Sequence, residues 1–318
     1  MGATARPLVA IVGPTAVGKS DLALRLALKF GGEIVSADSR QVYRGMDIGT
    51  AKPTPEQRRL VPHHLVDILE PDQEFSLATF LLLARRAIRS IRRRGGLPVV
   101  AGGSGQYLWA LLERWRPPGA APDRPLRREL ERRLAAAGLA PLVEELARLA
   151  PAVARRLDRR NPRRVLRALE LALGGGAPRP RRPERPLPGG TFLIGLTLPR
   201  SELYRRIDER VDGMVRSGLV EEVRRLLERC GPTTPVLGSL GYGQLAAYLQ
   251  GRFTHDEALR RIKSATHRFA RQQHNWFRLS DPRIRWYNAD EGGLRSALSD
   301  VAAFLAETAR ARPLPATS

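Results

Sequence analysis

The sequence predicts an α/β fold in which a parallel sheet is flanked by helices and interrupted by a helical insertion. Short apolar, β-rich runs alternate with helical patterns through the first third of the 318-residue chain, as in sheets built from strand–helix–strand units. The pattern changes at residue 117, where arginine-rich helical segments begin, and strand character returns at 191–198 (TFLIGLTL). We therefore expect an α/β core made of residues 1–116 and 191–318, and a helical insertion at 117–190.

The first third contains the elements that would build the sheet. Apolar runs of about five residues mark the strands, and apolar residues three and four positions apart mark the helices. Leu22, Ala23 and Leu26, for example, share one helical face. Ligands are expected at the carboxyl ends of the strands, because parallel strands end at the same edge of a sheet. The expected elements are a strand at 8–12, a helix at 19–30, a strand at 33–37, a candidate strand at 64–69, a helix at 76–94 and a strand at 98–101.

The middle of the chain changes in character. Residues 123–173 read as three arginine-rich helical segments, with breaks at Gly138, Pro151 and Pro162. The following stretch, 174–190 (GGGAPRPRRPERPLPGG), is too rich in proline, glycine and arginine to pack, and it is expected to be a mobile loop.

The C-terminal third is predicted to be helical. Thr254 and Glu257 form a Thr-x-x-Glu capping box, which opens a helix that extends through about Phe277. The apolar stripe of that helix is expected at Leu259, Ile262, Phe269 and Trp276.

Composition narrows the class of protein. A hydrophobic content of 42% and a charged content of 27% are typical of a globular chain with a packed core. The single cysteine, Cys230, excludes an internal disulfide and a cysteine-based metal cluster. No apolar run approaches the ~18 residues of a membrane span, and residues 1–12 do not have the form of a secretion signal. We expect a soluble cytoplasmic protein, and nothing demands more than a monomer.

The excess of basic residues requires a polyanionic partner. The chain holds 54 Lys and Arg against 32 Asp and Glu, a net charge of +22. Residues 117–190 carry 17 arginines against 8 acidic residues, roughly twice the net charge density of the remainder. A charge of this size implies attraction to nucleic acid or to an anionic membrane surface.

A phosphate-binding loop follows the first strand. Residues 13–20 (GPTAVGKS) match the pattern G-x-x-x-x-G-K-[ST]. In such a loop the glycines let backbone N–H groups turn toward phosphate oxygens, and the helix N-terminus adds partial positive charge. Lys19 is expected on a terminal phosphate, and the Ser20 hydroxyl is expected on Mg²⁺. The predicted phosphate-binding residues are Gly13, Pro14, Thr15, Ala16, Val17, Gly18, Lys19 and Ser20.

This P-loop predicts a polyphosphate ligand and leaves the reaction open. Most P-loop proteins are hydrolases or kinases, which usually carry a second strand that ends in a magnesium-binding Asp. Asp38 follows the strand EIVSA, where it could bind magnesium or face a substrate as a base. One alternative is a small-molecule P-loop kinase, which would have no use for a large basic insertion. Another is a non-enzymatic RNA-binding protein, which would need neither the P-loop nor Asp38.

A series of motifs in collinear order resembles one family. The motifs are the P-loop, 38–53 (DSRQVYRGMDIGTAKP), 63–67 (HHLVD), 102–108 (GGSGQYL), 164–170 (RVLRALE), 203–214 (LYRRIDERVDGM), 218–223 (GLVEEV), 241–242 (GY) and 266–277 (THRFARQQHNWF). Over roughly residues 8–280 the chain closely resembles the tRNA dimethylallyltransferases. The resemblance implies a P-loop NTPase-like parallel sheet whose P-loop holds the diphosphate of dimethylallyl diphosphate instead of ATP. It also implies a helical insertion that binds the anticodon stem-loop of tRNA, and no membrane partner.

The resemblance implies a reaction and the residues that carry it. Enzymes of this family transfer a dimethylallyl group to the exocyclic N6 amine of the adenosine on the 3′ side of the anticodon (position 37), and they release diphosphate. By resemblance, Asp38 accepts the amine proton, Ser104 donates to the oxygen that bridges carbon and phosphorus, and Arg210 stabilises the leaving diphosphate together with Mg²⁺. Ser104 stands where the family usually has threonine, and it keeps the hydroxyl group.

The resemblance also implies contacts with tRNA. The target base must leave its stack to react, and the segment 38–41 matches the family segment that contacts the flipped adenosine, with the Gln41 amide expected on an adenine edge. The arginines of the insertion suit phosphate contacts, which position RNA without reading its bases. The predicted tRNA-binding residues are Asp38, Ser39, Arg40, Gln41, Ser104, Arg127, Arg163, Arg164 and Arg167.

Some residues depart from the family pattern or have a structural interpretation. The family stretch Arg-Arg-Tyr-Ala-Lys-Arg-Gln reads HRFARQQ at 267–273, which loses two positive charges. Gly243 and Gln244 replace a commoner Lys-Glu pair. The adjacent His63 and His64 lack a carboxylate or cysteine at metal-ligand spacing, so a structural role is expected for both, and Trp276 and Phe277 are expected in the core.

Overall fold

The computed structural model describes residues 7–115, 123–174 and 190–310. The chain divides into two compact units, a core unit of Met1–Trp115 with Leu187–Ser318 and an insertion unit of Arg116–Pro186. The mobile loop expected at 174–190 lies almost entirely outside the described residues. No helix in the described ranges is both long enough and apolar enough to cross a bilayer.

The core unit contains a six-stranded parallel sheet, which confirms the predicted fold class. Its strand order is β3-β2-β4-β1-β5-β6, and every adjacent pair is parallel. The sixth strand was not predicted, because its sequence (RWYN) has neither an apolar run nor an alternating pattern. The strands are β1 (Leu8–Val12), β2 (Gly32–Ser36), β3 (His63–His64), β4 (Leu97–Ala101), β5 (Thr191–Thr197) and β6 (Arg285–Asn288).

The prediction of a strand at 64–69 is wrong in its bounds, because the observed strand β3 is only His63–His64. Only His63 and His64 pair with β2. The chain then turns at Leu65 and Asp67, whose φ angles are 63° and 55°. A left-handed backbone cannot continue an extended strand, and the turn instead brings Asp67 to the Lys52 ammonium group.

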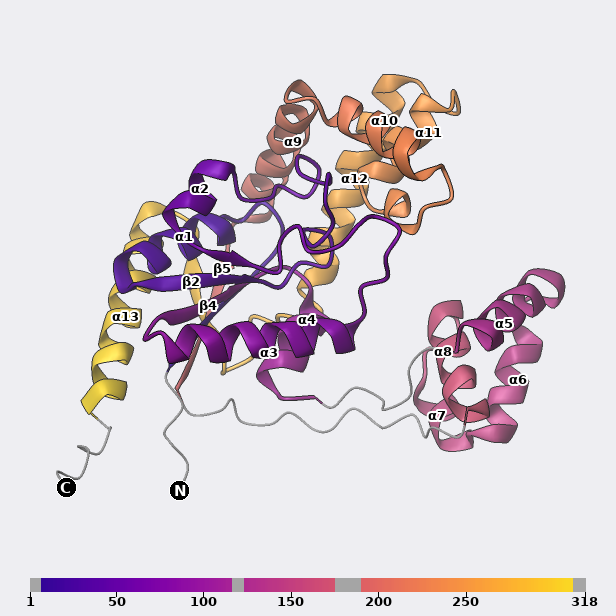
Figure 1. Ribbon diagram of the computed structural model, residues 1–318, viewed down its shortest axis with the longest axis horizontal. Coiled ribbons are helices and arrows are strands. Elements are labelled where there is room, and N and C mark those ends of the chain that lie inside the picture. Colours follow the sequence, from indigo (N-terminus) through magenta and orange to yellow (C-terminus); the bar gives the residue numbers. More distant parts are fainter. Residues whose placement is uncertain (1–6, 116–122, 175–189, 311–318) are drawn as a thin grey trace. The chain divides into compact units, whose positions relative to one another are not determined.

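Helices cover both faces of the sheet (Figure 1). In β1, Val9 and Ile11 face a cluster shared with α1 (Lys19–Phe30) and α13 (Glu291–Arg310), while Ala10 and Val12 face a cluster shared with α3 (Leu77–Arg93) and α4 (Gly105–Leu112). Burial on both faces explains why β1 is a continuous apolar run instead of an alternating one. The loops that follow the strands lie at the carboxyl edge of the sheet.

Of the remaining helices of the core unit, the first lies between β2 and β3 and the others follow β5. They are α2 (Pro55–Leu60), α9 (Arg200–Arg216), α10 (Leu219–Cys230), the 3₁₀ turn η1 (Pro235–Gly238), α11 (Tyr242–Leu249) and α12 (His255–Gln273). The α12 helix ends four residues earlier than predicted, and its stripe is wrong at Phe269, whose side chain is 41% exposed. Gln273 is buried in its place.

The N-terminus of α12 makes half of the predicted capping box. The Thr254 hydroxyl accepts a hydrogen bond from the Glu257 N–H at 3.2 Å. The Glu257 carboxylate does not return to the Thr254 N–H, and it pairs with Arg260 and Arg261 at 3.1 and 2.8 Å. Two guanidinium groups on the same helical face therefore compete successfully with the backbone for this carboxylate.

The insertion unit contains four described helices where three segments were predicted, although a helix begins or ends at each of the predicted breaks, Gly138, Pro151 and Pro162. The four helices are α5 (Arg124–Ala137), α6 (Ala140–Leu149), α7 (Pro151–Arg156) and α8 (Pro162–Leu173). Pro151 begins a helix of its own because proline fits the first helical turn, where its missing N–H is not needed. A leucine-rich core that includes Leu130, Leu142 and Leu146 holds the helices together.

Candidate active site

A cavity of about 820 Å³ lies where the P-loop, the end of β2, the loop after β4 and helix α9 meet. Most of the residues predicted for catalysis and phosphate binding line it. Gly13, Pro14 and Val17 are buried and build the P-loop from behind. The predicted residues that line the cavity are Thr15, Ala16, Gly18, Lys19, Ser20, Asp38, Ser39, Arg40, Gln41, Ser104 and Arg210.

The P-loop has the backbone conformation that its glycines allow. Gly13 has a φ of 140°, and a side chain there would put a Cβ atom 2.5 Å from the carbonyl oxygen of Leu196. Gly18 has a φ of 97° and forms the N-cap of α1. Left-handed residues in such a loop turn successive N–H groups to one side, which creates a concavity that binds anions.

Two cations line the cavity close to one carboxylate. Burial and the nearby Arg210 lower the pKa of Lys19 to about 7, while the charge of Asp38 opposes this shift. Burial also lowers the pKa of Arg210, again opposed by Asp38. The Lys19 ammonium group donates to the Pro14 carbonyl oxygen at 2.6 Å. Two poorly solvated cations against one acid make the cavity a strong site for an anionic ligand.

Asp38 is held at the tip of β2. Its Oδ1 atom accepts a hydrogen bond from the Arg40 N–H at 2.7 Å, which fixes the carboxylate relative to the backbone. Its Oδ2 atom has no hydrogen-bond partner among the residues that the structure describes. The side chain is half-buried at the cavity wall. One carboxylate oxygen is therefore oriented by the fold, and the other is available to a ligand.

Ser104 reaches the same cavity from β4. It is the N-cap residue of α4, yet its hydroxyl makes no capping hydrogen bond to that helix. Gly102 allows its loop to approach the end of β2, because a Cβ atom there would lie 2.3 Å from the Ala37 carbonyl oxygen. The hydroxyl of Ser104 and the carboxylate of Asp38 thus come from adjacent strand ends.

Gln41 has partners within the protein that its sequence does not suggest. Its Nε2 atom donates to the carbonyl oxygens of Thr50 and Ala51 at 3.2 Å, and its Oε1 atom accepts from the Ser36 hydroxyl at 2.8 Å. Both amide hydrogens are used to hold the loop that walls the cavity. One lone pair on Oε1 is left, so the contact of Gln41 with an adenine edge stays a prediction.

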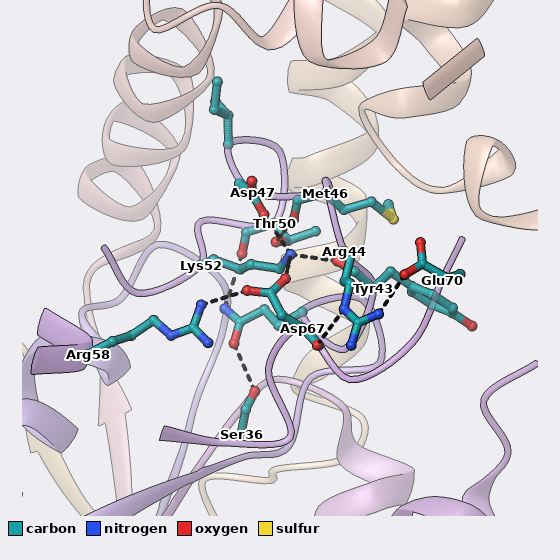
Figure 2. A network of polar contacts seen from close by, with 12 residues as sticks. Ser36, Tyr43, Arg44, Met46, Asp47, Thr50, Lys52, Arg58, Asp67 and Glu70 are labelled. Atoms are coloured by element: carbon teal, nitrogen blue, oxygen red, sulfur yellow. Dashed lines mark hydrogen bonds and ion pairs between the residues drawn. The ribbon is translucent and has the colours of Figure 1, made fainter. Parts of the chain in front are cut away.

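Lys52, which the sequence analysis did not single out, closes the same loop. Figure 2 shows its ammonium group directed at the Asp67 carboxylate and the Tyr43 carbonyl oxygen, with Asp47 at 2.6 Å. Arg58 also pairs with Asp67, at 2.6 Å. The Lys52 side chain is only 4% exposed, so its charge is matched by carboxylates and its role is to fix the loop.

Glu222 is a second residue that sequence reasoning missed. Its buried carboxylate accepts from the N–H groups of Asp47, Ile48 and Gly49 at 2.8–3.1 Å, and from the Tyr242 hydroxyl at 2.6 Å. A signal was present in the sequence, because Glu222 falls between Leu219 and Val223 on the buried face of α10. A carboxylate on an apolar face indicates a buried set of donors.

The predicted tRNA-binding arginines of the insertion unit differ in their surroundings. Arg163 and Arg164 are exposed at the start of α8. Arg167 and Arg127 instead lie 2.6 and 3.6 Å from the carboxylate of Glu170, whose side chain is 2% exposed. Arg127 and Arg167 therefore pair with a buried carboxylate of their own unit.

The paired histidines are held by protein groups. The Nε2 atom of His64 lies 2.7 Å from the Glu33 carboxylate, and the Nδ1 atom of His63 lies 2.8 Å from the Val61 carbonyl oxygen. The His64 contact joins β3 to β2, and the His63 contact joins β3 to the end of α2, which supports the structural role expected for both residues. Phe277 is buried, and Trp276 packs against the same cluster, as expected.

Comparison with known proteins gives consistent matches. The IPP transferase family model matches residues 41–280, and the isopentenyl transferase model matches residues 7–61. The tRNA dimethylallyltransferase of Thermomicrobium roseum is 52% identical over 91% of this chain and 88% of its own length, and that of a Roseiflexus species is 50% identical over 93% and 97%.

Solved structures extend the match to the whole fold. The tRNA isopentenylpyrophosphate transferase of Bacillus halodurans superposes with a TM-score of 0.71 at 38% identity, over 96% of this chain and 98% of that one. A eukaryotic dimethylallyltransferase captured acting on tRNA gives 0.77 at 26% identity, over 97% and 81%. With the P-loop cavity, these matches identify the chain as a member of the IPP transferase family.

Proposed function

We propose that this protein transfers a dimethylallyl group from dimethylallyl diphosphate to the N6 amine of the adenosine 3′ of the anticodon in tRNA. The observation that carries the proposal is that Asp38 lines the same cavity as the P-loop, Ser104 and Arg210. A phosphate cradle with a carboxylate beside it suits an alkyl transfer from a diphosphate. Membership of the IPP transferase family supports the same reaction.

The amine is the nucleophile and Asp38 is its base. The N6 lone pair attacks the first carbon of the allylic group, and the carbon–oxygen bond to the diphosphate breaks, with its electron pair leaving on oxygen. The amine proton passes to the Asp38 carboxylate. The amine is a weak nucleophile because its lone pair is delocalised into the purine ring, so a base at hydrogen-bond distance accelerates the attack.

The leaving diphosphate gains negative charge in the transition state. Lys19, the backbone N–H groups of the P-loop and Arg210 line the part of the cavity that would hold it. The Ser104 hydroxyl, which does not cap its own helix, can donate to the bridging oxygen as the bond breaks. Donors placed in advance stabilise developing charge without the reorganisation that water would require.

Ser20 fits a role as the protein's ligand to Mg²⁺. Its side chain is exposed at the start of α1 and lines the cavity beside Lys19. Among the residues with described positions, no group of three or more His, Cys, Asp or Glu side chains is placed to hold a metal. One protein hydroxyl suffices for Mg²⁺, which keeps several waters and takes other ligands from substrate phosphates. When bound, the ion would neutralise part of the diphosphate charge.

The decisive experiment for this proposal is a transfer assay. Purified protein is incubated with Mg²⁺, dimethylallyl diphosphate and unmodified tRNA, and the nucleosides of the digested tRNA are analysed by mass spectrometry. We expect N6-(dimethylallyl)adenosine and an equal amount of diphosphate. ATP hydrolysis or phosphate transfer without prenylated adenosine would contradict the proposal and favour a kinase.

Binding of the diphosphate should take up a proton above neutral pH. Lys19 has a pKa lowered to about 7, so the free enzyme is largely protonated there below pH 7 and largely neutral above it. The bound anion favours the charged lysine. At pH 8, where the diphosphate is already ionised, calorimetry in buffers of different ionisation enthalpy should give an uptake approaching one proton per ligand.

The matched variant for this measurement is Lys19→Arg, which keeps the charge and does not titrate in this range. It should bind the diphosphate with no proton uptake at pH 8, and its affinity should stay level between pH 6.5 and 8.5. A wild-type protein that binds without taking up a proton would contradict the assignment of Lys19.

We further propose that the insertion unit binds tRNA through exposed arginines. Arg163 and Arg164 have no carboxylate partner among the described residues, in contrast to Arg167 and Arg127. Each arginine that neutralises a phosphate steepens the salt dependence of binding by about 0.7–0.9 in log–log slope. Changing both Arg163 and Arg164 to alanine should reduce the slope by between about one and two, and it should raise the tRNA KM without lowering kcat.

The matched control for this change is Arg295→Ala, which removes one exposed arginine from α13. Filter-binding titrations of tRNA between 50 and 200 mM salt measure the slope, because the affinity falls steeply over this range. If the double variant keeps the wild-type slope, these arginines do not contact phosphates.

A further inference from the structure

A buried glutamine joins two loops of the cavity. Gln273 is the last residue of α12, and it is 3% exposed. Its neighbours in sequence, Arg271 and Gln272, are exposed. A polar side chain that is buried at a helix end, while adjacent polar residues face solvent, has partners that require it there.

The two ends of the Gln273 amide hold different loops. Its Oε1 atom accepts a hydrogen bond from the Thr15 N–H of the P-loop at 2.8 Å. Its Nε2 atom donates to the Gly103 carbonyl oxygen at 2.9 Å. Gly103 immediately precedes Ser104. The planar amide of Gln273 therefore sets the distance between the P-loop backbone and the loop that carries Ser104.

The approach of the amide depends on Gly103. A Cβ atom at this position would lie 2.3 Å from the Gln273 Nε2 atom and 3.9 Å from the Lys19 Nζ atom. A larger residue at position 103 would therefore displace the Gln273 amide from its present contacts. The Thr15 N–H is bound by Gln273, so it is not available to a phosphate oxygen in this arrangement.

The backbone that carries Gln273 is itself anchored. The N–H groups of Trp276 and Phe277 both donate to the Gln273 carbonyl oxygen at 3.0 Å. The Trp109 indole N–H donates to the Trp276 carbonyl oxygen at 2.7 Å. Trp109 belongs to α4, the helix that Ser104 begins. The end of α12 is therefore fixed to α4, the helix whose N-cap residue, Ser104, it helps to place.

We propose that Gln273 is a positioning residue that sets the spacing between the diphosphate cradle and the Ser104 hydroxyl. This inference rests on the proposed function, because the spacing matters for a hydroxyl that donates to the bridging oxygen as the bond breaks. The contacts demand an acceptor and a donor on one rigid group. Glutamine supplies both, whereas a carboxylate cannot donate and lysine or arginine cannot accept.

The first measurement is the effect of Gln273→Met, which keeps the length of the side chain and removes both hydrogen bonds. We expect kcat for prenyl transfer to fall by about 10- to 100-fold, the size expected when a reacting group moves by around an ångström. The tRNA KM should stay within about twofold of wild type. The matched control is Gln272→Met, an exposed glutamine on the same helix, which should retain wild-type kcat.

The second measurement separates positioning from general support of the fold. If Gln273 acts through Ser104, its loss has little further effect once the hydroxyl is gone. In a double-mutant cycle, Ser104→Ala with Gln273→Met should be no more than about threefold slower than Ser104→Ala alone. If Gln273→Met fails to fold, Gln273→Glu replaces it, since it keeps the acceptor for Thr15 and sets an oxygen against the Gly103 carbonyl.

The outcomes distinguish this inference from the proposed function. A wild-type protein that does not prenylate tRNA would contradict the proposed function. With an active wild type, a Gln273→Met variant that matches it in kcat would overturn the positioning role. Effects of the two substitutions that multiply in the double variant would overturn it as well, because they would show that Gln273 acts independently of Ser104.

Discussion

Replacing Asp38 with asparagine is expected to lower kcat for prenyl transfer by about 10²- to 10⁴-fold, the range typical for loss of a general base. The substitution keeps the side-chain oxygen that accepts the Arg40 N–H, so the strand end should retain its shape. What is lost is the ability to take the amine proton. Binding of tRNA should change little, because phosphate contacts supply most of the affinity.

Single-turnover kinetics with radiolabelled dimethylallyl diphosphate measures this loss directly, and tRNA titration checks that the binding is retained. Asp256→Asn is the matched control, because that carboxylate is 83% exposed in the first turn of α12. It should keep wild-type kcat. If Asp38→Asn turns over at the wild-type rate, Asp38 is not the base.

Replacing Arg210 with methionine is expected to lower kcat by about 10²- to 10³-fold, which is typical for one donor to a developing oxyanion. Arg210 lies beside Lys19 and Asp38, where burial strengthens its interaction with charge. From the sequence alone, Arg210 is one arginine on a helix of an arginine-rich protein, and the ordinary interpretation is a solvated side chain. Its place in the cavity excludes that interpretation.

The Arg210→Met variant should also change the titration of Lys19. The charge of Arg210 lowers the Lys19 pKa, so its removal should raise that pKa above 7. Proton uptake on diphosphate binding, measured by calorimetry at pH 8, should then decrease. Arg216→Met, at the exposed end of the same helix, is the matched control and should alter neither kcat nor proton uptake. A wild-type kcat in Arg210→Met would remove Arg210 from the diphosphate site.

The parts of the fold that were predicted correctly have local signals. The P-loop could be predicted because its glycines, lysine and serine are contiguous and lie between a strand and a helix. The strands β1, β4 and β5 contain continuous apolar runs, and β2 contains a shorter one, Ile34 and Val35. The errors occur where the local signal conflicts with distant partners. The segment after β3 turns toward Lys52 instead of extending. The end of α12 buries Gln273, while Phe269 is exposed and lines the cavity.

The insertion unit illustrates the same distinction. Four arginines there have similar sequence surroundings, and all were expected to contact tRNA. The structure divides them into two exposed residues, Arg163 and Arg164, and two that contact the buried Glu170. An arginine in a sequence has a known charge, while the partner of that charge is decided by helix packing.

By itself, the sequence determined the presence of the phosphate loop, the parallel sheet and the basic insertion, and it determined the family. Each of these has a signal in contiguous residues or in regular spacings. Only the tertiary structure decided which side chains meet in the cavity. Thr15 and Gln273 are 258 positions apart, and Gly103 and Gln273 are 170 apart, yet one amide joins them. Contacts over such separations arise from the packing of whole elements, which no local pattern specifies.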